Sequence, residues 1–261
     1  WASQASGTTQ TLWDIAFTSA QTGWAVGEGG KLLRTTNGGS GWNAQAINET
    51  RALQAIVFGS SQRGWLAGEQ GTAWLTTDGG NTWTWTPTGK TQTITSLAAP
   101  AETELWLAGL GHTVLRKSGS GGFNVNAPAA VEELKGVDAV DANTAYVVGD
   151  DAQILKTTDG GQSWRQLSSP AQNPGPGLDP AWLRGVKFFL NGSHHALHFF
   201  ASKCRCVSVF HGDVESQACS IAGVAEQGHA SSCEIHALLH IAQAVAIGGQ
   251  SGGIKAAAVV F

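Results

Sequence analysis

Residues 76–83 read Thr-Thr-Asp-Gly-Gly-Asn-Thr-Trp, and nearly the same stretch returns at residues 157–164 as Thr-Thr-Asp-Gly-Gly-Gln-Ser-Trp. An altered copy occupies residues 35–42, with Asn37 in place of the aspartate. Asp and Asn side chains accept backbone N–H bonds within their own turn, and glycines supply the positive φ angles that a tight hairpin needs. The stretch therefore predicts a hairpin turn, covered by the tryptophan that follows it.

The recurrence of this turn favours a structural role for its residues over a catalytic one. A carboxylate that returns at the same place in every copy is expected to hold the turn together. The residues assigned to the structural turn are Asn37, Asp78, Asp159, Trp42, Trp83 and Trp164. No residue is assigned as catalytic.

The tryptophans define a repeat. Trp1, Trp42 and Trp83 are 41 residues apart, and so are Trp24, Trp65 and Trp106, with Tyr146 following 40 residues later. Each unit contains four short apolar stretches separated by glycine-marked turns. Four antiparallel strands per period of about 40 residues are typical of a β-propeller blade. We therefore expect an all-β fold, a propeller of four-stranded blades.

Four complete units and parts of others are visible. We place the blades at about 12–50, 53–90, 94–128 and 134–169, and the start of another at residue 183. In the first unit we expect strands at 12–17, 23–27, 31–36 and 42–47. The second unit should have strands at 53–58, 64–68, 72–77 and 83–88, and the third at 94–99, 104–109, 113–118 and 123–127. In the fourth unit we expect strands at 134–140, 145–149, 153–158 and 164–168. Residues 1–5 resemble residues 42–46, which predicts an outer strand there. That strand either completes the last blade of a closed ring or belongs to a longer propeller.

The tail at 190–261 departs from the pattern set by the repeats in 1–189. All 11 Trp precede residue 183, whereas all four Cys and seven of the eight His follow it. We consider three interpretations: an out-of-frame continuation, a separate or disordered segment with a helix near 233–247, and a metal site. The metal ligands would be Cys204, Cys206, Cys219, Cys233, His236 and His240. Their spacing contains no paired Cys-x-x-Cys, so we assign no metal site.

The composition narrows the class of partner. Charged residues make up 13% of the chain and the formal net charge is −4, which gives no reason to expect nucleic acid as a partner. The sequence contains no apolar run long enough to cross a bilayer and no signal peptide, so we expect no membrane insertion. It has no methionine, which favours a processed product or a fragment. No phosphate loop or zinc-protease motif is present, and we predict no cofactor.

A family resemblance rests on two motifs that occur together. Residues 23–27 read Gly-Trp-Ala-Val-Gly and residues 35–39 read Thr-Thr-Asn-Gly-Gly. These units resemble the β-propellers of the photosystem II stability and assembly factor family and its bacterial relatives outside photosynthesis, over residues 1–189. The resemblance implies a seven-bladed ring, incomplete here. It also implies export to a thylakoid lumen, periplasm or extracellular space, and protein binding without catalysis, with a membrane protein complex as a candidate partner.

Three basic residues occupy the same place in the third strand of their units: Arg34, Arg116 and Lys156. Blade two has Leu75 there. Because the family resembled here is described as binding its protein partner through an arginine-rich patch, the resemblance makes these residues candidate partner-binding residues. The simpler interpretation is a solvated strand position.

A second set is acidic and follows the second-strand glycine: Glu28, Glu69 and Asp150. This loop shares a face with the linkers between blades, including the proline-rich segment 169–182, so it is a candidate for specificity. Ordinary polar turn residues are the plainer interpretation.

The alternative function is part of a glycoside hydrolase or carbohydrate-binding propeller, because the Asp-Gly turn also occurs in sialidases, xyloglucanases and sorting-receptor propellers. A sialidase needs a tyrosine nucleophile, and the one tyrosine, Tyr146, occupies a position otherwise held by Trp. A hydrolase of the xyloglucanase type needs two carboxylates, and no unique pair stands out. We therefore expect a scaffold that is not an enzyme.

Overall fold

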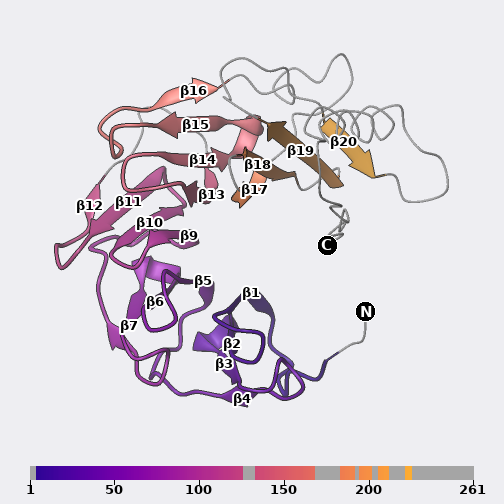
Figure 1. The fold of residues 1–261 in the computed structure, drawn as a ribbon. Coiled ribbons are helices and arrows are strands. Elements are labelled where there is room, and N and C mark those ends of the chain that lie inside the picture. The colour runs from indigo at the N-terminus through magenta and orange to yellow at the C-terminus, as the bar shows by residue number, and fades with distance from the viewer. Residues whose placement is uncertain are drawn as a thin grey trace.

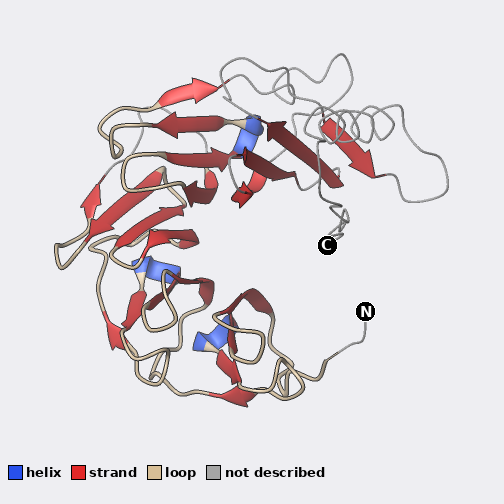
Figure 2. Cartoon of the chain, in the orientation of Figure 1, coloured by secondary structure: helices blue, strands red, loops and turns tan. Residues whose placement is uncertain are grey.

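The structure is a computed structural model of the 261-residue chain. It describes residues 4–125 and 133–167, and the backbone of four strands between residues 183 and 224. Within these residues the chain forms five four-stranded antiparallel sheets, each in the order of its sequence (Figures 1 and 2). The predicted all-β fold of four-stranded blades is confirmed.

Each blade is built from four consecutive strands. Blade 1 contains β1 (Leu12–Phe17), β2 (Gly23–Gly27), β3 (Leu32–Thr35) and β4 (Asn43–Ala44). Blade 2 contains β5 (Leu53–Phe58), β6 (Gly64–Gly68), β7 (Ala73–Thr76) and β8 (Thr84–Trp85). Blade 3 contains β9 (Ile94–Ala101), β10 (Glu104–Gly109), β11 (Thr113–Ser118) and β12 (Asn124–Val125). Blade 4 contains β13 (Leu134–Ala139), β14 (Ala145–Gly149), β15 (Ile154–Thr157) and β16 (Arg165–Leu167).

The blades follow one another along an arc. The first strands β1, β5, β9 and β13 lie toward the inside of the arc, and β4, β12 and β16 lie along its outer side (Figure 1). Neighbouring first strands contact one another in chain order, from β1 through β5 and β9 to β13. The described residues do not close the arc into a ring, so the predicted seven-bladed ring stays a prediction.

The core lies between blades. The second strands β2, β6 and β14 are buried at every residue, as befits strands covered on both faces. Trp24, Trp65 and Trp106, each at most 3% exposed, lie in three hydrophobic clusters that join neighbouring blades. The predicted tryptophan period is therefore the period of the interblade core.

The outer strands are shorter than predicted. We expected them to begin at Trp42, Trp83, Phe123 and Trp164, but each begins one residue later and extends for only two or three residues. The turn continues to the residue before the tryptophan, where Thr82 N–H donates to Asp78, and this leaves little length for pairing. Three short 3-10 turns at Glu28–Gly30, Glu69–Gly71 and Asp150–Ala152 were not predicted.

A fifth sheet contains part of the tail. β17 (Leu183–Asn191) begins at the predicted residue, and β18 (His194–Ala201), β19 (Arg205–His211) and β20 (Ile221–Val224) pair after it. Backbone pairing therefore continues past residue 189, and the boundary drawn there from composition stays a prediction. The expected helix near 233–247 lies outside the described residues. So do residues 1–3, and Gln4 and Ala5 are not in a strand.

Candidate functional site

The Asp78 turn is a closed set of hydrogen bonds. Thr82 donates to Asp78 through its backbone N–H (2.9 Å) and its hydroxyl (2.6 Å). The Thr76 hydroxyl donates to Asp78 Oδ1 (2.8 Å) and accepts the N–H of Gly80 (2.8 Å). These bonds stabilise the charged carboxylate, with the Thr82 hydroxyl the largest cause, and lower the pKa of Asp78 to about 2.

The same geometry recurs in the other complete copy. Asp159 accepts the backbone N–H and hydroxyl of Ser163 and the hydroxyl of Thr157. The Ser163 hydroxyl is the largest cause that lowers the pKa of Asp159 to about 2. Asn37 accepts the N–H of Gly41 at 2.9 Å through its amide oxygen. These side chains use their oxygens within their own turns, as expected for structural residues.

The three basic residues lie over aromatic rings. The Arg34 guanidinium carbon is 5.4 Å from the centre of the Trp24 ring, and that of Arg116 is 5.5 Å from the Trp106 ring. Lys156 Nζ is 5.7 Å from the Tyr146 ring. Each pair joins directly opposed residues of the second and third strands of one blade. The set therefore forms a repeated cation–aromatic pair, which is more than a solvated strand position.

Two of these cations also reach a neighbouring group. Arg34 Nη1 donates to Asn81 Oδ1 at 2.7 Å, which connects blade 1 to the turn of blade 2. Arg116 forms an ion pair with Glu104 at 3.1 Å and lies against Gly160 of the blade 4 turn. The arginines thus lie at the junctions between blades, where part of each guanidinium is already bound.

The Trp65 ring of blade 2 has a cation beside it that was not predicted, and this cation comes from blade 3. Leu75 takes the third-strand position, and Lys117 of blade 3 lies 6.0 Å from the Trp65 ring and 5.7 Å from the Phe123 ring. Lys117 is 7% exposed, and burial, followed by the nearby Arg63, lowers its pKa. The sequence did contain a signal for this contact. Lys117 directly follows Arg116, and blade 2 has Leu75 at the third-strand position where the other three blades have a cation.

The acidic set connects loops within blades. Glu28 accepts the N–H of Thr11, and Glu69 accepts the N–H of Ala52 at 3.0 Å. Asp150 forms an ion pair with Lys135 at 3.5 Å. These contacts attach the loop after the second strand to the start of the first strand, which agrees with the plainer structural interpretation.

A buried carboxylate that was not predicted from the sequence lies between blades 1 and 2. The Glu49 side chain is 4% exposed and accepts bonds from Arg51 Nε (2.9 Å), the Thr72 hydroxyl (2.8 Å) and Trp74 Nε1 (3.2 Å). Burial alone would raise the pKa of Glu49, but the bonds from Arg51 and Thr72 outweigh it and lower the pKa to about 2. Glu49 lies in a linker, where no repeat pattern could identify it.

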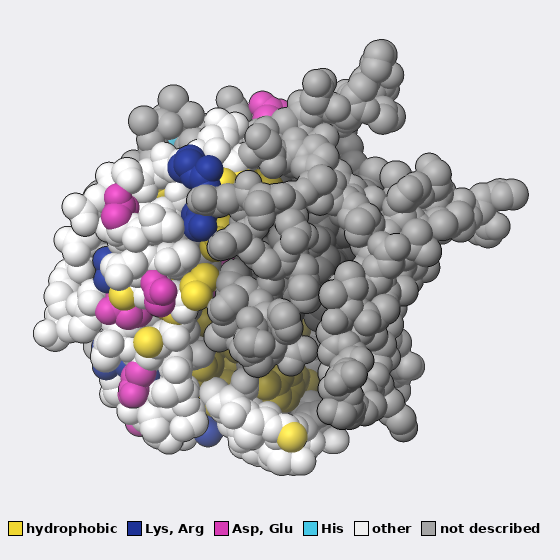
Figure 3. All heavy atoms as spheres, turned by 45° about the horizontal axis from the view of Figure 1, so that its top comes forward, with side chains coloured by type: hydrophobic (Ala, Val, Ile, Leu, Met, Phe, Trp, Pro, Cys, Tyr) yellow, Lys and Arg dark blue, Asp and Glu magenta, His cyan; other side chains and the backbone are white. Residues whose placement is uncertain are grey.

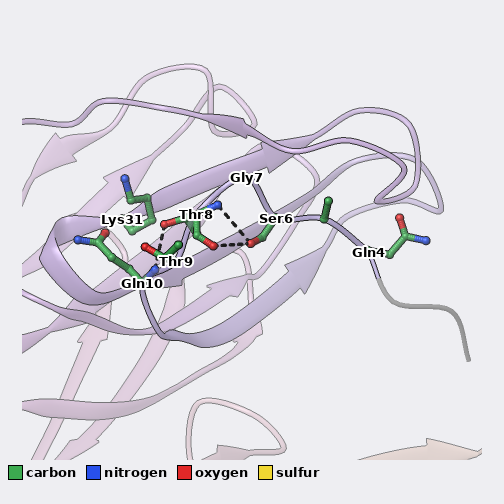
Figure 4. Close-up of a pocket in the computed structure, with 8 residues that line it drawn as sticks. Gln4, Ser6, Gly7, Thr8, Thr9, Gln10 and Lys31 are labelled. Carbon is green, nitrogen blue, oxygen red and sulfur yellow. Dashed lines mark hydrogen bonds between the residues drawn. The ribbon is translucent and has the colours of Figure 1, made fainter.

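A pocket near the first residues, the tyrosine and the charged surface are less suited to be a catalytic site. A shallow polar pocket is lined by residues 4–10 and Lys31, and the hydrogen bonds drawn in it connect residues of that one segment (Figure 4). Tyr146 is 3% exposed beneath Lys156, as a packing residue is. On the described part of the face in Figure 3, acidic and basic side chains are interspersed.

No metal-binding group of three or more ligand residues occurs among the described residues. Cys204, Cys219, Cys233, His236 and His240 lie outside the described residues, and Cys206 is described only as backbone in β19. None of the helices in the described ranges is long and apolar enough to cross a membrane.

Comparison with known proteins supports the resemblance. Residues 1–90 match the model of the family described as Photosynthesis system II assembly factor YCF48. No curated protein sequence matches the chain. The resemblance of the repeats to the photosystem II assembly-factor family is confirmed by this match.

Solved structures share the fold. The structure described as "YCF48 bound to D1 peptide" matches with a TM-score of 0.58 and 18% identity, covering 77% of this chain and 63% of that chain. YCF48 from Cyanidioschyzon merolae matches with a TM-score of 0.56 and 15% identity, covering 74% and 67%. An ancestral GH74 enzyme matches with a TM-score of 0.62 and 15% identity, covering 85% and 32%. This chain thus spans less than two thirds of the first of these structures.

Proposed function

Because its repeats are of the photosystem II assembly-factor type, we propose that this chain is a non-catalytic protein-binding scaffold. Its working place is an exported compartment, the thylakoid lumen, the periplasm or the extracellular space. Its partner is a protein segment, with a membrane protein complex as the source of that segment. The observation that carries the proposal is the family match over residues 1–90, together with a similar structure described as bound to D1 peptide.

The site geometry is compatible with this role. The candidate carboxylates Asp78 and Asp159 hold turns, and Glu28 and Glu69 hold loops, so these groups serve the framework. The basic residues Arg34, Arg116 and Lys156 are each partly exposed and share one position in the repeat. A partner that carries carboxylates would add contacts to these cations at several blades at once.

The fold alone does not separate this proposal from its alternative. GH74 enzymes share the architecture, including one from Niastella koreensis that matches with a TM-score of 0.59 and 17% identity. At such identity the likeness concerns the fold and leaves activity open. A hydrolase of this architecture needs two carboxylates free to face a sugar.

Binding of the D1 peptide to the full chain tests the proposal. We expect Arg34→Gln with Arg116→Gln to weaken binding about tenfold, because two charge-assisted contacts are lost. Lys31→Gln with Lys90→Gln removes the same charge at partly exposed lysines outside the set, and should leave the affinity unchanged.

The arginines also hold blade junctions, so a second variant is needed. Lys156→Gln removes the cation over Tyr146, and among the residues whose side chains the structure describes Lys156 has no contact with another blade. Weakened binding in both variants, with melting curves like that of the parent chain, supports the cation set as the site. Unchanged affinity in both removes these three residues from the binding site, and absence of peptide binding by the parent chain contradicts the proposal.

A further inference from the structure

Two positive charges meet at the junction between blades 2 and 3. Lys117 of blade 3 lies over the Trp65 ring of blade 2, with Nζ 6.0 Å from the ring centre. Arg63 comes two residues before Trp65, and alternate residues of a strand point to the same face of a sheet. Arg63 therefore belongs to the face of blade 2 that Lys117 covers. Burial, followed by the charge of Arg63, lowers the pKa of Lys117.

The repeat shows a different residue at this position in blade 3. The residue two positions before Trp106 is Glu104, which is the equivalent of Arg63. Glu104 forms an ion pair with Arg116, the cation that lies over the Trp106 ring. Blade 3 thus places a carboxylate beside its junction cation, whereas blade 2 places a second cation there. The other two blades have a neutral residue at this position, Thr22 and Thr144.

The two cations have no carboxylate partner among the described residues. Each ion pair found in that part of the chain joins other side chains, and neither Arg63 nor Lys117 takes part in one. Lys117 donates one of its three N–H groups to the carbonyl of Gly121. The Nε atom of Arg63 is buried, and within the described ranges it has no hydrogen-bond partner. Two cations withdrawn from water side by side repel each other and leave their donors unpaired, so an anion would stabilise this junction.

The surroundings suit a small anion that enters from the Arg63 side. Lys117 is 7% exposed and packs against the Trp65 and Phe123 rings. Arg63 is partly exposed, so a small solute can reach its guanidinium from the solvent. A guanidinium presents parallel N–H donors that match the two oxygens of a carboxylate, and an ammonium adds a compact charge.

We infer that Arg63 and Lys117 form a binding site for a small carboxylate anion at the junction between blades 2 and 3. The anion takes the part that Glu104 has in blade 3, and its oxygens accept bonds from the Arg63 guanidinium. A carboxylate is favoured over other anions because it is the group that the repeat itself pairs with a junction cation. None of the three candidate partner-binding cations belongs to this site, so the inference is independent of the proposed function.

Arg63→Glu tests the inference, because it gives blade 2 the carboxylate that blade 3 has. In sodium chloride this variant should melt a few degrees above the parent chain, since an attraction to Lys117 replaces a repulsion. Sodium acetate at the same ionic strength should raise the melting temperature of the parent chain by a few degrees more than that of the variant. Lys31→Gln removes a charge outside the site and is the control, which should respond to acetate as the parent chain does.

Binding itself is measured by saturation-transfer difference NMR with acetate and the full chain. The acetate methyl protons should receive saturation from the parent chain and from Lys31→Gln, and should lose most of it with Arg63→Glu. Arg63→Gln, which removes the charge without supplying a carboxylate, should lose it as well. Equal signals from the parent chain and both Arg63 variants overturn the inference. So does a parent chain that melts at the same temperature in chloride and in acetate, or an Arg63→Glu variant that melts below the parent chain in chloride.

Discussion

At the scale of single residues, the chain uses its scarce charges to hold backbone groups in place. Asp78 and Asp159 each accept bonds from a hydroxyl and an N–H four residues later and from a threonine two residues earlier. Glu49 does the same for the junction between blades 1 and 2. The carboxylates of Asp78 and Asp159 therefore hold their turns, and that of Glu49 holds a junction between blades.

The turn carboxylates should make stability depend on pH. The pKa values of Asp78 and Asp159 are lowered from 3.8 to about 2 in the folded chain. Because the folded value lies below the unfolded one, their contribution is complete above the unfolded pKa and is lost as the pH falls through the folded pKa. We expect the Asp78→Asn, Asp159→Asn double variant to melt a few degrees below the parent chain at about pH 6 and near it at about pH 2. A difference in melting temperature that stays constant with pH would contradict this.

Glu49 gives a second test by mutation. Glu49→Gln keeps the size of the side chain but weakens the bonds from Arg51, Thr72 and Trp74. The free energy of unfolding in urea should fall by about 2 kcal/mol, because buried donors lose a charged acceptor. Glu102→Gln, at an exposed residue, is the control and should change it little. Equal effects of the two substitutions would show that Glu49 is not a structural centre of the junction.

At the scale of elements, the second strand of each blade and the turn of the next form one packing unit. Trp24 lies against Phe58, Arg34 reaches Asn81, and Gly80 lies against the Trp24 ring edge. In blades 3 and 4 the residue equivalent to Phe58 is alanine. There Phe123 and Trp164 contact the preceding tryptophan directly, with ring centres 6.0 and 6.1 Å apart. A ring from the first strand or from the turn thus fills each junction.

The two turn glycines provide a matched comparison of this packing. Gly80 and Gly39 have positive φ angles of 75° and 89°, so alanine is strained at both. Only at Gly80 does the added Cβ also collide with Trp24, which is 1% exposed and has little room to move. Gly80→Ala should therefore destabilise the chain by about 1 kcal/mol more than Gly39→Ala, as overpacking does. Equal losses in urea unfolding would mean that the junction is looser than the structure shows.

Many of the strands could be predicted from the sequence, because the same pattern of residues recurs in each repeat. The bounds of β1, β2, β5, β6, β10, β11 and β14 agree with the expectations. The outer strands could not be predicted in full, because the hydrogen bonds of the turn extend to the residue before the tryptophan and delay the start of the strand. The cation positions could not be predicted in full, because they depend on contacts between blades. The position of Lys117 over Trp65 requires knowing how blade 3 packs on blade 2, and no periodicity within one blade contains that information.

At the scale of the whole molecule, four blades and a fifth sheet form an arc (Figure 1). At each junction between blades 1 to 4, the second-strand tryptophan packs against a ring of the next blade. The family match over residues 1–90 and the shared fold agree with a propeller built by repetition. The same architecture occurs in GH74 enzymes, so the function depends on side chains that the repeat does not dictate. Arg34, Arg116 and Lys156 are our candidates, and they stay a prediction.

The central claim, a scaffold that binds protein and not sugar, is tested most directly by one calorimetric experiment on the full chain. The D1 peptide and a xyloglucan oligosaccharide are titrated in parallel, and the sugar samples are then assayed for cleavage. The account predicts saturable binding of the peptide, with neither binding nor cleavage of the oligosaccharide. Cleavage of the oligosaccharide without peptide binding would contradict it.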